Sequence, residues 1–206
     1  MKLYFVRHGE SEANLLYEFS NRGLKHGLTE TGKFQAQSLA QTLQIASITK
    51  IFTSPLLRAI QTAEILAQAL GIPYEIAEAL REVDCGVLEG TSDEASWQAF
   101  WKLCDAWLKS RAWEARMEQG ESFLDLQRRF VPFIERLVRE YQSLPGGLVL
   151  VGHGGTYRCM LPLVLSNIDL EYGVGHGLSH TAVVIAEVKP AGLVCLAWGE
   201  TVLAAA

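Results

Sequence analysis

Two short apolar runs, far apart in the chain, each stop abruptly just before a histidine that is followed by glycine. Residues 3–6 precede His8, and residues 148–151 precede His153. A continuous apolar run of this length is typical of a strand buried on both faces, as in a parallel sheet. Ligands of open α/β sheets bind beyond the carboxyl ends of the strands. We therefore expect the two histidines to lie at one edge of the same sheet.

Helical and strand-like patterns alternate between and after these runs. Apolar spacing predicts helices that begin near residue 31 with Thr29 or Thr31 as N-cap, at Ser54-Pro55, after Ser122 and near Thr156. Further short strands are expected at 51–53, 74–76, 182–188 and 193–198. Alternation of this kind predicts an α/β fold, a three-layer α/β/α sandwich with a mainly parallel central sheet.

Composition limits the class of protein. Of 206 residues, 49% are hydrophobic and 20% charged, so a single domain over 1–206 can build a core without disulfides or a structural metal. The formal charge of -5 disfavours a nucleic-acid partner. The N-terminal apolar run is too short for a signal peptide, and no window approaches the roughly 18 apolar residues of a membrane span. The four cysteines form no C-x-x-C pair, and we expect a cytoplasmic protein with reduced thiols.

Arg7 and His8 place a guanidinium beside an imidazole at the end of the first strand. A cationic neighbour makes this a poor metal site but a good anion site, because arginine binds pairs of oxygens and neutral histidine can attack phosphorus. A solvated loop without function is the alternative for this short motif taken alone.

Five short motifs follow one another along most of the chain. They are Arg7-His8-Gly9-Glu10-Ser11-x-x-Asn14, Leu28-Thr29-x-x-Gly32, Ser54-Pro55-x-x-Arg58-Ala59-x-x-Thr62-Ala63, Glu82 with Gly86, Glu89 and Gly90, and Gly152-His153-Gly154-Gly155. In order and spacing they resemble the histidine phosphatase superfamily, in the branch that includes the cofactor-dependent phosphoglycerate mutases.

The resemblance implies roles for individual residues. It implies that His8 is the nucleophile that becomes phosphohistidine and that Arg7, Arg58 and His153 form the phosphate pocket. It also implies that Glu82 gives a proton to the leaving oxygen. No metal and no cofactor is then expected, because these groups can stabilise the charge of phosphoryl transfer. The resemblance also implies contacts to the phosphate or substrate at Ser11, Asn14 and Gly154.

The carboxylate assignment leaves alternatives open. Glu82 could instead pair with Arg81 or Arg58, and Asp84 or Glu89 could be the acid. For His153 the alternative is a hydrogen-bonded histidine of the core. The remaining histidines, His26, His176 and His180, have no comparable context.

Residues 91–119 carry four of the five tryptophans, and apolar side chains from Trp97 to Leu108 recur at the spacing of an amphipathic helix. These rings are either ordinary core or part of a lid. Because an insertion at this place covers the phosphate pocket in the family that the chain resembles, we interpret the segment as a helical lid insertion.

The basic residues in this segment are dispersed, at Lys102, Lys109, Arg111 and Arg116, whereas the mutases carry paired arginines there. We therefore expect a phosphatase acting on a small phosphate monoester. A phosphoglycerate mutase and a non-catalytic phosphate-binding module are the alternatives. The sequence leaves the oligomeric state open, with a homodimer among the alternatives.

Overall fold

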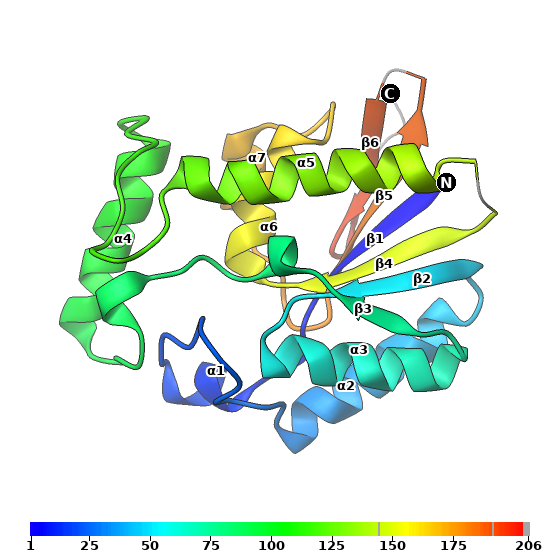
Figure 1. Cartoon of the computed structure of the whole chain (residues 1–206), viewed down its shortest axis with the longest axis horizontal. Coiled ribbons are helices and arrows are strands. Elements are labelled where there is room, and N and C mark those ends of the chain that lie inside the picture. Colours follow the sequence, from blue (N-terminus) through cyan, green and yellow to red (C-terminus); the bar gives the residue numbers. More distant parts are fainter. Residues whose placement is uncertain (144, 191, 204–206) are drawn as a thin grey trace.

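The computed structural model describes residues 1–143, 145–190 and 192–203. A seven-stranded sheet with the order β3-β2-β4-β1-β5-β6-β7 forms the centre of the molecule (Figure 1). The strands are β1 (Lys2–Arg7), β2 (Ile48–Thr53), β3 (Tyr74–Ile76), β4 (Gly147–Gly152), β5 (Val183–Lys189), β6 (Gly192–Trp198) and β7 (Thr201–Val202).

Four neighbouring strands, β3, β2, β4 and β1, run parallel, and β5, β6 and β7 continue the sheet in antiparallel pairs. The helices are α1 (Glu12–Leu16), α2 (Glu30–Leu43), α3 (Leu57–Leu70), α4 (Glu94–Leu108), α5 (Phe123–Tyr141), α6 (Gly154–Met160) and α7 (Leu170–Gly175). Single 3-10 turns occupy Glu78–Leu80, Gly86–Leu88 and Leu161–Leu163.

Helices cover both faces of the sheet, which confirms the predicted layered α/β fold. α2 and α3 lie on one face, and α5 and α6 lie on the other (Figure 1). Side chains of a strand point alternately to the two faces. On β1, Leu3 and Phe5 accordingly pack in the cluster under α5, whereas Val6 packs in the cluster under α2 and α3. The central strands are therefore buried on both sides, as their uninterrupted apolar sequence predicts.

The predicted N-cap residues are right at two helices and wrong at a third, and the fourth helix, expected near Thr156, begins at Gly154. Thr29 caps α2 by accepting from the backbone N–H of Gly32, and Ser122 caps α5. Ser54 does not cap α3, because the helix begins at Leu57 after the N-cap residue Leu56. The Ser54 hydroxyl lies instead 2.7 Å from Nε2 of His153. The serine of the Ser-Pro motif thus contacts a site histidine and does not cap the helix.

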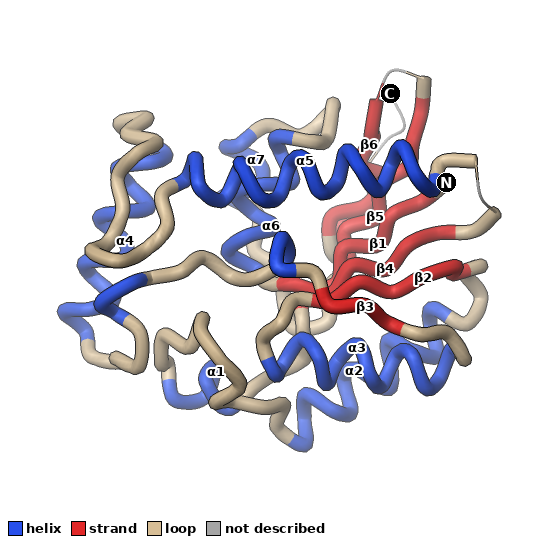
Figure 2. The backbone as a smooth tube through the Cα atoms, in the orientation of Figure 1, coloured by secondary structure: helices blue, strands red, loops and turns tan. Residues whose placement is uncertain are grey.

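The tryptophan-rich segment forms α4 and an irregular return loop that lies beyond the end of the sheet (Figure 2). The apolar spacing from Trp97 to Leu108 correctly predicts this helix. Trp107 is only 2% exposed, and its indole N–H donates to the carbonyl of Ala115, 2.7 Å away. Trp101, on the same helix, is 55% exposed. Trp107 is therefore a core residue, whereas the Trp101 side chain is accessible at the surface.

No helix among the described residues has both the length and the apolar character needed to cross a membrane.

Candidate active site

The two histidines that follow β1 and β4 meet at the carboxyl edge of the sheet. β1 and β4 are adjacent and parallel, with Arg7 opposite Gly152. The backbone N–H of His8 donates to the Gly152 carbonyl at 3.0 Å, so the pairing extends to the first histidine. The ring centres of His8 and His153 are 5.0 Å apart, and both side chains are buried. Parallel pairing thus brings together residues 145 positions apart in the sequence.

His8 is held as a neutral imidazole with a defined tautomer. Its Nδ1 lies 2.6 Å from the carbonyl oxygen of Gly9, and its Nε2 lies 3.2 Å from the Nε–H of Arg58. A carbonyl accepts and a guanidinium donates, so Nδ1 carries the proton and Nε2 carries the lone pair. Burial first, and then the positive charges of Arg58 and Arg7, hold the pKa of His8 well below its ordinary value.

Arg58 is buried and held at all three of its nitrogens. Besides donating to His8, it donates through Nη1 to the Ser20 carbonyl at 2.6 Å and through Nη2 to Asn21 Oδ1 at 3.1 Å. Burial lowers its pKa to about 10, and the charges of Glu82 and Glu89 oppose that shift. Because the lowered value is still above neutral pH, the guanidinium is a fixed positive charge beside the nucleophilic nitrogen.

Arg7 is held by the segment that leads into β5. Its Nη1 donates to the Leu178 carbonyl at 2.6 Å, and its Nη2 lies 3.1 Å from Nε2 of His180. Its Nε is buried and finds no partner within the described part of the chain. Leaving a buried donor unsatisfied is costly, so this N–H is suited to an oxygen of a bound anion.

His153 combines a fixed ring with one free nitrogen. The Ser54 hydroxyl lies 2.7 Å from its Nε2, whereas its buried Nδ1 has no partner among the residues the structure describes. Burial, followed by the charges of Arg58 and His8, keeps its pKa well below the ordinary value. His153 is not among the residues that line the cavity described below, but its ring lies beside that of His8 and can offer a hydrogen bond there without adding a permanent charge.

The Glu82 carboxylate is anchored on the first turn of α6. Its Oε2 accepts from the Gly155 N–H at 2.9 Å, and its Oε1 accepts from the Thr156 N–H at 2.7 Å and from its own neighbour Val83 at 3.0 Å. A Cβ at Gly155 would stand 2.9 Å from Oε1. Glycine is therefore required there for the carboxylate to approach the helix.

The other acids near this turn are occupied elsewhere. Asp84 pairs with Arg22 at 2.8 Å, and Glu89 accepts from the backbone N–H groups of Asn21 and Arg22. Neither lines the cavity described below, whereas Glu82 does. The geometry favours Glu82 over both alternatives as the acid at the site.

Of the three residues predicted to contact the phosphate or substrate, two line the cavity and Ser11 does not. Ser11 is fully buried at the start of α1, where its backbone N–H and hydroxyl donate to Asn14 Oδ1 at 3.0 and 2.9 Å. Asn14 and Gly154 line the cavity, and a Cβ at Gly154 would stand 3.4 Å from the Arg7 side chain. Ser11 therefore orients Asn14 in this structure.

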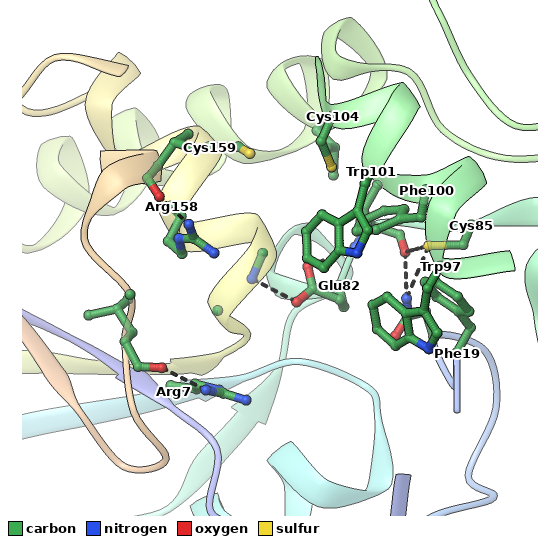
Figure 3. Close-up of a pocket in the computed structure, with 18 of the residues that line it drawn as sticks. Arg7, Phe19, Glu82, Cys85, Trp97, Phe100, Trp101, Cys104, Arg158 and Cys159 are labelled. Carbon is green, nitrogen blue, oxygen red and sulfur yellow. Dashed lines mark hydrogen bonds between the residues drawn. The ribbon is translucent and has the colours of Figure 1, made fainter. Parts of the chain in front are cut away.

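A cavity of about 580 Å³ opens from these groups toward α4. Figure 3 shows Arg7 and Arg158 on one side of the view, the rings of Trp97, Trp101 and Phe100 on the other side, and Glu82 between them. The cavity thus joins a basic, histidine-containing pocket to an aromatic wall.

His180 and Ser54 reach the site without having been singled out as site residues. The His180 ring centre is 6.1 Å from that of His8, and burial and Arg7 lower its pKa to about 4. β5 runs antiparallel to β1, with Val183 opposite Val6. A residue just before an antiparallel neighbour strand lies where the first strand ends, and this is the signal that identifies His180.

Among the described residues, no group of three or more histidine, cysteine, aspartate or glutamate side chains is arranged to bind a metal ion.

A family model described as the histidine phosphatase superfamily (branch 1) matches residues 3–201. The chain therefore belongs to this superfamily, whose members are phosphatases or mutases. It is 37% identical over 174 residues to the mouse protein 6-phosphofructo-2-kinase/fructose-2,6-bisphosphatase 1, a match that covers 82% of this chain and 34% of that protein. The chain thus spans about a third of the length of that relative.

Two further matches cover most of both partners. A protein of Photorhabdus laumondii named as a probable phosphoglycerate mutase, GpmB, is 35% identical over 173 residues, with 80% of this chain and 75% of that protein covered. The solved structure of Bacillus stearothermophilus YhfR superimposes with a TM-score of 0.83 at 26% identity and covers 97% of each chain. The fold of this chain is therefore that of known members of the superfamily.

Proposed function

We propose that the protein is a metal-independent phosphatase that hydrolyses a small phosphate monoester through a phosphohistidine on His8. The observation that carries the proposal is the state of the His8 ring, whose Nδ1–H is bound to the Gly9 carbonyl so that Nε2 keeps a lone pair. That lone pair lies in a cavity also lined by Arg7, Arg58 and Glu82.

In the first half of the reaction, the Arg58 Nε–H turns from Nε2 of His8 to a phosphoryl oxygen, and the freed lone pair of Nε2 forms a bond to phosphorus as the bond between phosphorus and the alcohol oxygen breaks. The departing electron pair stays on that oxygen, which takes a proton from a protonated Glu82 and leaves as the alcohol. Oε1 already accepts from Val83 and Thr156, whereas Oε2 has Gly155 as its donor. Oε2 is therefore the oxygen suited to carry the proton.

In the second half, water attacks the phosphorus of the phosphohistidine. Glu82, now a carboxylate, takes a proton from the water, and the bond between nitrogen and phosphorus breaks with its electron pair returning to Nε2. Inorganic phosphate leaves, and His8 and Glu82 regain their starting states. The cycle is ping-pong and needs no external reagent beyond water.

Charge on the transferring oxygens is stabilised by groups that are already in place. Arg7 offers its unpartnered Nε, Arg58 offers a buried guanidinium, and His153 offers Nδ1. Donors fixed in advance around developing charge are the main source of rate enhancement in phosphoryl transfer. Neither a metal nor a cofactor is needed in this scheme.

Hydrolysis is favoured over transfer between two phosphate groups by the distribution of cations. Beyond the phosphate pocket, the described cavity-lining residues include one further cation, Arg158. A bisphosphate needs a second basic site, and the dispersed Lys102, Lys109, Arg111 and Arg116 do not line the cavity. Phosphoglycerate mutase activity is the second candidate, supported by the similarity to the GpmB protein.

We also propose that residues 91–119 form a lid over this pocket and that the chain is a single domain. The protein is proposed to work in the cytoplasm, with a small-molecule phosphate ester as its partner.

The test is a panel of phosphate esters assayed with excess EDTA, with His8→Ala as the comparison. Turnover in EDTA, loss of turnover in His8→Ala and an acid-labile, base-stable phosphoenzyme in the wild type are expected. Full activity of His8→Ala would eliminate the scheme. Isomerisation of 3-phosphoglycerate that depends on a bisphosphate primer and outpaces hydrolysis would establish the mutase instead. Phosphate binding without any turnover would indicate a non-catalytic module.

A further inference from the structure

Four aromatic rings form a continuous wall on the side of the cavity away from Arg7. This aromatic wall consists of Phe19, Trp97, Phe100 and Trp101, all of which line the cavity. We propose that the aromatic wall binds the alcohol part of the substrate, so that preferred substrates are phosphate monoesters whose alcohol carries a flat ring and no second anionic group. This inference rests on the proposed phosphatase function and specifies its substrate class.

Each ring of the wall lies against a neighbouring ring of the wall. Phe19 and Trp97 have ring centres 4.2 Å apart, Trp97 and Trp101 are 5.7 Å apart, and Phe100 and Trp101 are 5.5 Å apart. The two longer separations lie in the range of favourable aromatic pairs, and Phe19 and Trp97 are closer still, with their ring planes tilted by 31°. The four rings therefore form one continuous aromatic surface. A ring of the substrate placed against it could make the same kind of contact.

The wall is attached to the residues that hold the phosphate pocket. Phe19 is followed by Ser20, whose carbonyl accepts from Arg58. The backbone N–H of Phe19 donates to the Thr91 carbonyl, and the Phe19 carbonyl accepts from the Gly90 N–H. The Trp97 indole N–H donates to the Tyr17 carbonyl at 2.8 Å. Because the same segment fixes Arg58 and the wall, the distance between phosphate and ring subsites is set by the backbone.

Trp101 is the ring of the wall that is most available to a ligand. It is 55% exposed although it lines the cavity, in contrast to Trp107 on the same helix, which is 2% exposed. Trp101 and Glu82, the proposed proton donor to the leaving oxygen, line the same cavity (Figure 3). An alcohol that leaves beside Glu82 can therefore extend toward the aromatic wall. Large exposed rings at the mouth of a polar site are characteristic of ligand-binding surfaces.

The charged residues around the wall offer little to a second anionic group. Glu18 and Asp105 line the cavity, and each is paired with a lysine outside it. Arg158 is the one cation among the described lining residues besides Arg7 and Arg58. Its Nη2 donates to the Val174 carbonyl, and its buried Nε, which has no partner among the described residues, leaves a single N–H for an anion. Tight recognition of a carboxylate or second phosphate needs several convergent donors. The outer cavity therefore favours an uncharged alcohol.

The experiment compares two esters whose leaving groups are both simple primary alcohols, 2-phenylethyl phosphate and ethyl phosphate, with 3-phosphoglycerate as the anionic probe. The wild type is expected to show a kcat/KM for the phenylethyl ester at least about tenfold above that for the ethyl ester. Its kcat/KM for 3-phosphoglycerate is expected to be lower than for the phenylethyl ester by a similar factor.

Trp101→Ala is expected to reduce the phenylethyl-to-ethyl ratio to within about threefold of unity, because the phenylethyl ester loses more kcat/KM than the ethyl ester does. Trp101→Phe should retain most of the ratio. Trp113→Ala is the matched control, because Trp113 lies in the same segment but packs on Phe123, with ring centres 4.7 Å apart, and does not line the cavity.

The outcomes separate this inference from the proposed function. If no ester is hydrolysed in a His8-dependent way, the phosphatase function fails. If esters are hydrolysed but the ratio is near unity, or Trp101→Ala lowers both esters equally, the aromatic wall does not select the substrate. Equal effects of Trp113→Ala and Trp101→Ala on the ratio would also overturn the proposal. The loss of preference would then come from disturbed folding of residues 91–119 and not from a lost contact with the substrate. Preference for 3-phosphoglycerate would overturn the requirement for an uncharged alcohol.

Discussion

The Glu82 carboxylate is bound to Thr156, three residues after His153, through both the backbone and the side chain of that threonine. Oε1 lies 2.7 Å from the Thr156 N–H and 2.8 Å from its hydroxyl. The acid and the second histidine of the site are thereby attached to the same turn of α6. A change in this turn would move the proposed proton donor relative to the phosphate pocket, and the contribution of Glu82 can be tested without replacing Glu82 itself.

Gly155→Ala displaces the carboxylate, because the new Cβ would stand 2.9 and 3.0 Å from its two oxygens. A misplacement of about 1 Å can cost about 100-fold in rate, and the smaller shift that relieves these two contacts should cost about tenfold. We expect such a loss in kcat for ethyl phosphate, and a much smaller loss for p-nitrophenyl phosphate, whose leaving oxygen needs no proton. Gly175→Ala is the control, since a Cβ there meets nothing within 4 Å. Equal losses for the two esters would show that the displaced group is not the proton donor.

Arg58→Lys tests whether the fork of a guanidinium is required beside His8. A lysine cannot donate at once to His8, Ser20 and Asn21, as Arg58 does through three nitrogens. We expect kcat/KM to fall at least about 100-fold and the free energy of unfolding in urea to fall by about 2–3 kcal/mol, since buried acceptors lose their donors.

The matched control for Arg58 is Arg22→Lys. Arg22 is exposed and pairs with Asp84 at 2.8 Å, so its replacement should change stability by no more than about 0.5 kcal/mol. An Arg58→Lys enzyme with near wild-type kcat/KM would mean that the positive charge alone suffices.

Hydrophobic pattern was enough to predict the layers of the fold. The runs that became β1 and β4 are apolar throughout because both faces of these strands are covered, and such runs are unambiguous once they end in glycine and charge. The start of α3 could not be predicted, because Ser54 is a good capping residue by type. Its hydroxyl is used by His153, a partner 99 positions away that no local pattern reveals.

The motifs identified the groups that the structure gathers at the cavity, since Arg7, His8, Arg58 and Glu82 all line it. They could not show how each group is held. The Gly9 carbonyl that orients His8 and the Ser20 carbonyl that holds Arg58 are backbone atoms, and any residue type supplies them. His180 escaped attention because its place depends on the antiparallel pairing of β5 with β1.

His180→Ala should weaken the site through Arg7 and through Asn14, whose Oδ1 also lies 3.1 Å from Nε2 of His180. The His180 Nε2 lies 3.1 Å from Arg7 Nη2, while Leu178 still holds the other terminal nitrogen at 2.6 Å. We therefore expect a partial loss, of about tenfold in kcat/KM, with partial recovery in His180→Asn. His176→Ala is the control, because that ring is exposed and stacks on Tyr172. If the two alanine variants lose the same activity, His180 has no specific role in positioning Arg7.

The buried histidines should make stability fall with acidification. Burial and neighbouring arginines hold the pKa values of His8 and His153 well below the ordinary value, whereas in the unfolded chain each histidine titrates near about 6.5. As the pH falls below about 6.5, the unfolded chain takes up protons that the native state excludes. The free energy of unfolding should then decrease by up to about 1.4 kcal/mol per pH unit for each such histidine, and it should be fully retained above this range.

Urea unfolding at pH 7.5 and 5.5 measures this dependence. In His153→Asn the stability difference between the two pH values should be smaller than in the wild type by about 1 kcal/mol, because one excluded proton has been removed. His176→Asn, at an exposed position, should leave the difference unchanged. If His153→Asn keeps the wild-type pH dependence, His153 takes up its proton as readily in the folded protein as in the unfolded chain, and its role as a neutral donor in the phosphate pocket fails with it.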